Sequence, residues 1–143
     1  YENLESIKKY LDEIEFEGKM EIPLLYTDGE NIKYKDGLPI NFSEFGGIKF
    51  SSKIDNNVSS INAGPVESTT DWGYGEGEKD AESFIKRYEE LVTLIYKYNK
   101  ISGFCYTQLY DVEQECNGFY TYDRKPKLTK EQIQRIKNIN NIK

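Results

Sequence analysis

Asn41-Phe42-Ser43-Glu44-Phe45-Gly46-Gly47-Ile48 decides the fold of this chain, because it closes a short apolar strand pattern with one carboxylate and two glycines. A carboxylate at the end of a rigid strand has a fixed position, and glycines let the chain turn sharply and leave room for a ligand. Simple alternation places Glu44 on the same face as Ile40 and Phe42, so either this face lines a barrel or a bulge re-aims the carboxylate. Taken alone, the motif also fits an ordinary strand end beside a glycine turn.

Three stretches have the apolar spacing of an amphipathic helix. The first covers residues 2–16, and the second covers residues 81–98 and is capped at its start by Asp80. The third begins at Thr129, which forms a capping box with Gln132. The apolar stripes are interpreted as core faces, and in the first two helices they consist of Leu4, Ile7, Leu11, Ile14, Phe84, Tyr88, Leu91, Val92 and Ile95.

Two strands are predicted, over residues 38–43 and 101–108, each between two of the helices. Residues 19–37 are rich in turn signals and contain one short extended piece at 32–35. Residues 51–79 form a long polar loop, which in a compact domain is uncommon unless it is functional. The expected order of helix, strand, helix, strand, helix is that of an α/β chain.

The composition describes one soluble globular unit of 143 residues, 37% hydrophobic and 31% charged. The net charge of −6 argues against a nucleic-acid partner, and the basic residues between 124 and 143 are interpreted as a solvated helix face. No stretch approaches the roughly twenty apolar residues of a membrane span, so we expect no membrane partner. The chain has no His, which excludes Ser-His-Asp chemistry and His-ligated zinc, and we expect no metal and no other cofactor.

Two further motifs follow the opening one in the sequence: Trp72-Gly73-Tyr74-Gly75, and the segment SGFCYTQLYDVEQECNGFYTYDRKPK at residues 102–127. In this order the three motifs resemble the C-terminal part of the catalytic barrel of glycoside hydrolase family 2, the beta-galactosidase and beta-glucuronidase family. The resemblance covers residues 38–127 closely and the flanking helices loosely.

The resemblance implies an α/β fold of the (β/α)8 TIM-barrel type and a retaining glycosidase, with a nucleophilic Glu that matches Glu44. It also implies an acid/base Glu preceded by Asn on an earlier strand, and this chain has no such pair. A complete barrel needs about 250 residues. We therefore expect residues 1–143 to be a single unit, the C-terminal portion of an O-glycosyl hydrolase barrel that acts on a carbohydrate substrate. The chain starts at Tyr1 without a Met, which agrees with a piece of a longer protein.

Two aromatic residues are candidates for substrate binding. Trp72 lies in the long loop between two glycines, where its ring either stacks on a sugar or anchors its own loop. Tyr106 occupies a position where the family usually carries an aromatic residue, so it either forms a floor under the sugar ring or packs in the core. The sequence leaves both pairs of alternatives open.

A competing candidate is a metal site at Asp111, Glu113, Glu115 and Asn117, four oxygen-bearing side chains at alternate positions. A calcium loop of the EF-hand type needs Gly at its sixth position and Glu at its twelfth, where this chain has Cys116 and Tyr122. An acidic rim of the active site is therefore the favoured interpretation. Cys105 and Cys116 are interpreted as free thiols.

A barrel that lacks most of its strands has open backbone edges and uncovered apolar faces. We therefore expect the isolated chain to be inactive, and either to self-associate or to be marginally stable. The alternative function is a non-catalytic sugar-binding or structural domain derived from such a barrel.

Overall fold

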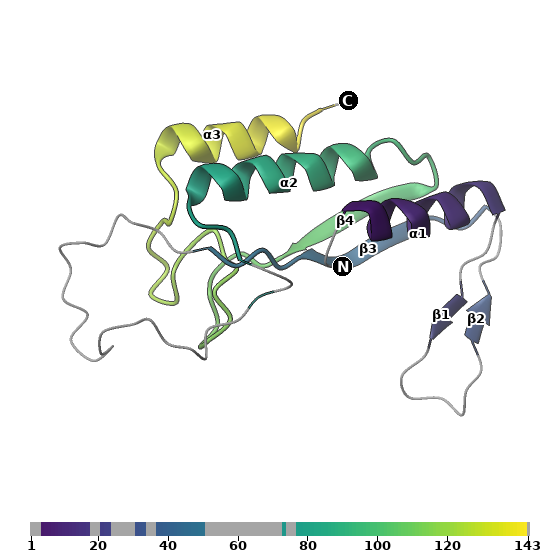
Figure 1. Cartoon of the computed structure of the whole chain (residues 1–143), viewed down its shortest axis with the longest axis horizontal. Helices are drawn as coiled ribbons and strands as arrows, with labels where there is room; N and C mark the ends of the chain where they lie inside the picture. The colour runs from purple at the N-terminus through teal and green to yellow at the C-terminus, as the bar shows by residue number, and fades with distance from the viewer. Residues whose placement is uncertain are drawn as a thin grey trace.

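The computed structural model describes residues 4–17, 21–23, 31–33, 37–50, 73 and 77–142. The chain is an α/β chain (Figure 1), and its elements are α1 (Leu4–Glu17), β1 (Glu21–Pro23), β2 (Asn31–Lys33), β3 (Ile40–Gly46), α2 (Ala81–Ile95), β4 (Ile101–Thr107) and α3 (Lys130–Ile139). β3 and β4 pair in parallel, and β1 and β2 form a separate antiparallel pair.

The predicted helices and strands are confirmed, with shifted ends. The sequence placed Glu44 at the end of the strand. β3 instead begins after Pro39 and runs to Gly46, so Glu44 lies inside it. The β1 strand was not predicted, because three residues in a polar, turn-rich stretch give too little periodicity to be recognised. β2 overlaps the extended piece expected at 32–35.

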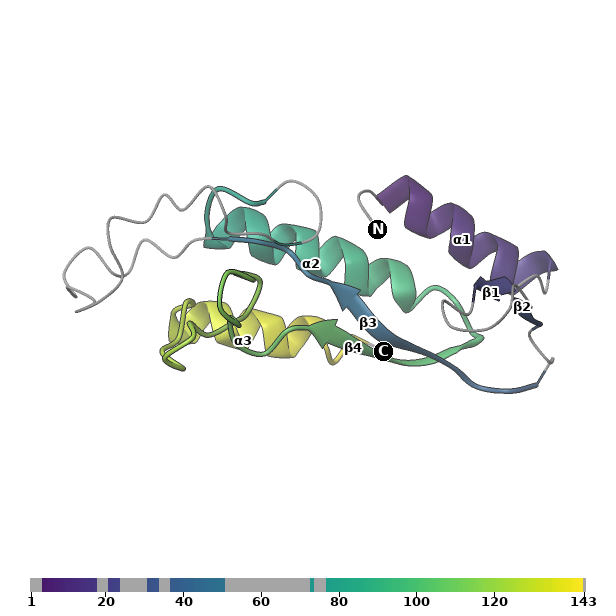
Figure 2. The ribbon, with the colours of Figure 1, turned by 90° about the horizontal axis from the view of Figure 1, so that it is seen from below.

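The helices α2 and α3 lie side by side on one side of the β3–β4 pair (Figure 1), and α1 packs against α2. The view from below shows β3 crossing in front of α2, with β4 beside it (Figure 2). The core between the layers comes from both: Phe42 and Phe45 of β3 are buried with the stripe of α2, which consists of Phe84, Ile85, Tyr88, Leu91, Val92, Leu94 and Ile95. The five residues of this stripe that were predicted from their spacing are all buried, and Ile85 and Leu94 are buried beside them.

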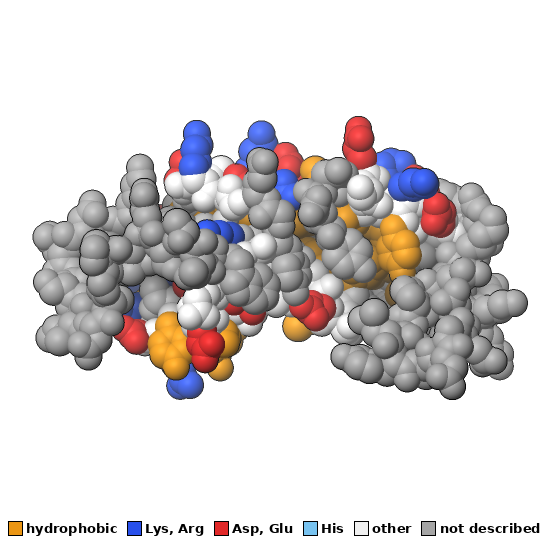
Figure 3. Space-filling model, turned by 60° about the horizontal axis from the view of Figure 1, so that its bottom comes forward, with side chains coloured by type: hydrophobic (Ala, Val, Ile, Leu, Met, Phe, Trp, Pro, Cys, Tyr) orange, Lys and Arg blue, Asp and Glu red, His pale blue; other side chains and the backbone are white. Residues whose placement is uncertain are grey.

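The side of the molecule away from α2 and α3 carries no helix among the described residues. Figure 3 turns this side forward, and both hydrophobic and acidic side chains reach the surface there. Parallel sheets in α/β proteins are usually covered on both faces. The β3–β4 pair therefore has one covered face and one face that the described elements leave open.

No helix in the described part of the chain has the length and apolar character that crossing a bilayer requires.

Both N-caps proposed from the sequence are confirmed. The Thr129 hydroxyl oxygen accepts a hydrogen bond from the Gln132 amide, and the Gln132 side-chain oxygen accepts one from the Thr129 amide. Asp80 accepts from the Ser83 amide at 2.8 Å, and this bond, with a second one from the Ser83 hydroxyl, lowers the pKa of Asp80 below its ordinary value of 3.8. The Asp80 carboxylate therefore stabilises the folded chain in its charged form.

We expect α2 to lose this stabilisation in acid. Because the folded pKa of Asp80 lies below 3.8, the contribution is complete above 3.8 and is lost as the pH falls through the folded pKa. Thermal melts between about pH 6 and about pH 3 measure this loss. Asp80→Asn keeps the capping oxygen without the charge, so its melting temperature should fall less over the same range. Equal slopes for the two proteins would contradict the prediction.

Candidate functional site

A bulge in β3 determines where Glu44 lies. Phe42 pairs with Phe104 and Phe45 pairs with Tyr106, so Ser43 and Glu44 together stand opposite the single residue Cys105. Phe42 and Phe45 are both buried, whereas Ser43 and Glu44 are both exposed. Of the two arrangements that alternation left open, the structure has the bulge, and the carboxylate is exposed because one extra residue is accommodated in the strand.

Polar side chains are also exposed on these strands at Cys105 of β4 and Asn41 of β3. Cys105 is a free, exposed cysteine directly opposite the bulge. Asn41 lies two residues before Ser43, and its side-chain oxygen is 3.1 Å from where a Cβ on Gly103 would be. A glycine in β4 therefore leaves space for a polar side chain of β3 on this face.

One residue after Glu44, the chain turns through two glycines in left-handed conformations. Gly46 has φ of +91° and Gly47 has φ of +58°, which other residues adopt only with strain. A Cβ on Gly46 would overlap the Tyr106 ring. The Gly47 amide donates to the Thr107 carbonyl at 2.9 Å, so the turn stays joined to the end of β4.

The chain returns to this turn at Gly73. A Cβ on Gly73 would lie 2.8 Å from the Gly47 carbonyl oxygen and 2.9 Å from the Lys49 amide, which is too close for any side chain. A second contact with this segment lies just before α2, where the Glu78 amide donates to the Lys49 carbonyl at 2.7 Å. The residue after Trp72 thus touches the backbone that follows Glu44. Trp72 itself lies outside the described residues.

Tyr106 points into the aromatic core. Its ring makes edge or tilted contacts with Phe45, Phe84, Tyr88 and Phe119, with centroids 4.8 to 6.2 Å apart. These are the contacts of a core tyrosine, one of the two roles left open by the sequence. Burial raises the pKa of its hydroxyl above the ordinary value of 10.0. The hydroxyl therefore stays protonated, and its partners are two backbone groups.

The segment after β4 is held together by a buried ion pair. Lys127 is 3% exposed, and its ammonium lies 3.0 and 3.2 Å from the two carboxylate oxygens of Asp111, with the Phe50 ring 4.2 Å away. Asp111 also accepts from the Gly118 amide at 2.8 Å. Burial lowers the pKa of Lys127, and the Asp111 carboxylate opposes that shift.

This pair corrects two expectations. Lys127 does not belong to a solvated helix face, because it precedes α3 and is buried. Asp111 is buried and engaged by Lys127, so it is not part of an exposed acidic rim. Within the described residues, no group of three or more Cys, Asp or Glu side chains is placed to hold a metal ion.

Gln108 is a polar residue at this edge that was not predicted to be functional. It directly follows Thr107, the last residue of β4. Its side-chain nitrogen is buried and has no hydrogen-bond partner in the described part of the chain. A buried amide donor without a partner is costly unless water or a ligand accepts from it. No local pattern distinguishes such a residue in a sequence.

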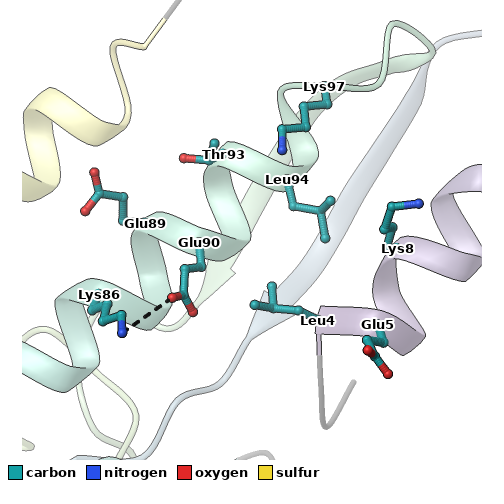
Figure 4. A pocket seen from close by; sticks show the side chains of 9 residues that line it. All are labelled: Leu4, Glu5, Lys8, Lys86, Glu89, Glu90, Thr93, Leu94 and Lys97. Carbon is teal, nitrogen blue, oxygen red and sulfur yellow. Dashed lines mark ion pairs between the residues drawn. The ribbon is translucent and has the colours of Figure 1, made fainter.

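A groove lies elsewhere, between α1 and α2 (Figure 4). It encloses about 560 Å³, and Leu4 and Leu94 face each other across it. Thr93, three lysines and three glutamates line the rest, the charged residues being Lys8, Lys86, Lys97, Glu5, Glu89 and Glu90. Lys86 and Glu90 form an ion pair. Glu44 is not among the residues that line the groove, and the balanced charges of the groove favour no particular class of ligand.

The predicted site residues are therefore brought together only in part. Glu44 and Tyr106 lie on adjacent strands, but Glu44 is exposed while the Tyr106 ring packs against α2. The contacts converge on the backbone from Gly47 to Lys49. Gly73 packs against this segment, and the Tyr106 hydroxyl is hydrogen-bonded to it. No protein-family model and no curated protein sequence matches this chain.

Proposed function

We propose that this chain is part of the catalytic barrel of a retaining glycosidase similar to glycoside hydrolase family 2, with Glu44 as the nucleophile. The observation that carries the proposal is the convergence of the three motifs at one turn. Glu44 precedes the turn, Gly73 contacts it and Tyr106 is hydrogen-bonded to it, although 62 residues separate the first from the last. Ligand sites of α/β proteins lie at the carboxyl ends of parallel strands, which is where this turn is.

Glu44 would act on the anomeric carbon of a bound glycoside. Its carboxylate attacks that carbon, the bond to the leaving-group oxygen breaks, and a covalent glycosyl-enzyme forms. A second carboxylic acid gives its proton to the departing oxygen and then takes one from the water that releases the sugar. In retaining enzymes the two carboxyl groups are about 5 to 5.5 Å apart. The sequence offers no acid/base Glu in the family's pattern, so this partner would come from upstream strands.

Other residues of the edge have places in this scheme. The buried Gln108 amide is a donor for a sugar hydroxyl, and Trp72 remains a candidate for stacking on the sugar ring. The Tyr106 ring lies in the core, so its contribution is to shape the turn. No metal or cofactor enters the reaction as proposed.

The experiment that tests the proposal is covalent trapping in a complete barrel that contains this chain. Glycosides with an activated leaving group and fluorine at the 2-position accumulate as glycosyl-enzymes, because the fluorine slows the release step more than departure of a good leaving group. A panel of galactoside, glucuronide and mannoside reagents covers the substrate classes. We expect mass spectrometry to find the sugar on the peptide that contains Glu44. A sugar on a different carboxylate would contradict the assignment.

The second candidate function is a sugar-binding or structural domain that has kept the motif without the chemistry. The exposed Glu44 fits both functions. The trapping experiment separates them, because a binding domain forms a reversible complex with the reagent and no covalent adduct.

The proposal also includes self-association of the isolated chain. The β3–β4 pair has outer edges that no described strand covers, and exposed strand edges recruit further strands. Light scattering across a concentration series measures the mass of the particles. A monomer at every concentration, with a cooperative melt, would show that these residues close their own core.

A further inference from the structure

Tyr106 joins three segments that are distant in the sequence. Its hydroxyl accepts a hydrogen bond from the Ile48 amide at 3.3 Å and donates one to the Asn117 carbonyl at 2.9 Å. Ile48 lies four residues after Glu44, and Asn117 lies in the segment that follows β4. The Tyr106 hydroxyl therefore links the segment that follows β3 to the segment that follows β4.

The fit of the Tyr106 ring depends on the absence of a side chain at Gly46. The ring occupies the space where a side chain on Gly46 would be, and its edge faces the ring of Phe45 with centroids 5.8 Å apart. The ring is thus in contact with the two residues that directly follow Glu44. Its hydroxyl then fixes Ile48, which is 1% exposed.

The backbone after Glu44 is consequently held at two successive amides. The Gly47 amide is bonded to the Thr107 carbonyl, and the Ile48 amide is bonded to the Tyr106 hydroxyl. Both partners come from the last two residues of β4. Between these bonds and the bulge there are only two residues, Phe45 and Gly46, so the direction of the strand at Glu44 depends on this attachment.

We propose that Tyr106 is a positioning residue whose hydroxyl fixes the Gly46–Gly47 turn and thereby orients the Glu44 carboxylate. This inference rests on the proposed function of Glu44. The ring contacts alone would be met equally well by Phe, and the hydroxyl is the part of Tyr106 that a purely apolar core position does not need. Its raised pKa keeps the proton that the bond to Asn117 requires.

Tyr106→Phe is the variant that tests the proposal, because it keeps the ring and removes both hydrogen bonds. Tyr96→Phe is the matched control: its hydroxyl also donates to a backbone carbonyl, that of Asn140 at 2.7 Å, but at the far end of α2. In the 143-residue chain, NMR hydrogen exchange reports the Ile48 amide directly. We expect Tyr106→Phe to speed exchange at Ile48 by about tenfold and Tyr96→Phe to leave it unchanged.

The kinetic test uses the complete barrel. A misplacement of about 1 Å in a reacting group can cost about 10²-fold in rate. We expect Tyr106→Phe to lower kcat by about 10- to 100-fold with KM changed less than about twofold, and Tyr96→Phe to change neither. A sugar floor that acts through its ring predicts unchanged kcat and KM for Tyr106→Phe. Unchanged kcat would overturn the proposal, even if exchange at Ile48 accelerates.

Covalent trapping tests the role of Glu44, and hydrogen exchange at Ile48 tests the role of Tyr106, so the two proposals can fail separately. If the trapped sugar lies elsewhere than on Glu44, the assignment of the nucleophile fails, while exchange at Ile48 still measures the bond to Tyr106. If exchange at Ile48 is the same in Tyr106→Phe as in the parent chain, the hydroxyl does not hold the turn. In that case the positioning role fails whatever the trapping experiment finds.

Discussion

Glu44→Gln in a complete barrel is expected to lower kcat by about 10⁴-fold and to leave substrate binding nearly intact. The amide has the size of the carboxylate, and Glu44 is exposed on the bulge, so the substitution does not disturb the core. What it removes is the negative oxygen that attacks the anomeric carbon. Steady-state kinetics with an aryl glycoside gives kcat, and calorimetry with a slow substrate analogue gives the affinity.

The control for this measurement is Glu89→Gln, which makes the same chemical change at an exposed position of α2. It should retain the activity of the parent enzyme. The isolated 143-residue chain should hydrolyse nothing, since general acid assistance alone is worth about 10²- to 10⁴-fold. Near-normal turnover by Glu44→Gln would refute the role of Glu44, and turnover by the isolated chain would place the second carboxylate within it.

Lys127→Met is expected to destabilise the chain by about 3 to 5 kcal/mol, because it leaves the Asp111 carboxylate buried without its cation. Methionine fills much of the same volume against Phe50, so the main loss is the charge and its hydrogen bonds. The Cys116 carbonyl also loses the ammonium, which lies 3.2 Å from it. Unfolding in urea, followed by far-UV circular dichroism, measures the free energy of unfolding.

Two further variants identify the cause of this loss. Lys125→Met removes an exposed lysine of the same segment and should cost less than about 1 kcal/mol. Asp111→Asn combined with Lys127→Met removes the unpaired charge and keeps an acceptor for the Gly118 amide. This double variant should recover part of the stability. A single Lys127→Met variant as stable as the parent chain would show that the pair is not desolvated.

The helices could be predicted because their signals are local. Asp80 and Thr129 directly precede α2 and α3, and each bonds to a residue only three positions further along the chain. The apolar stripe of α2 repeats over fifteen residues. Such patterns survive without knowledge of the rest of the chain. The position of Glu44 could not be predicted in the same way, because a bulge breaks alternation and depends on the partner strand.

The buried pair of Asp111 and Lys127 was missed for a related reason. Sixteen residues separate them, and nothing near either residue distinguishes it from an exposed charge. The same applies to Tyr106, for which two roles were compatible with the sequence, and its ring contacts with Phe84 and Tyr88 favour the core. Long-range contacts decided each of these cases. Trp72 retains both alternatives, because it lies outside the described residues.

The bulge in β3 changes which residues of the strand face the core. Phe42 and Phe45 face the core although they are three positions apart, an odd spacing that a regular strand would assign to opposite faces. Deleting Ser43 would restore even spacing and leave both rings inward, with Glu44 outward between them. Sequences one residue shorter here can therefore share the same core and the same exposed carboxylate. An alignment that forbids gaps inside strands would place that carboxylate out of register by one.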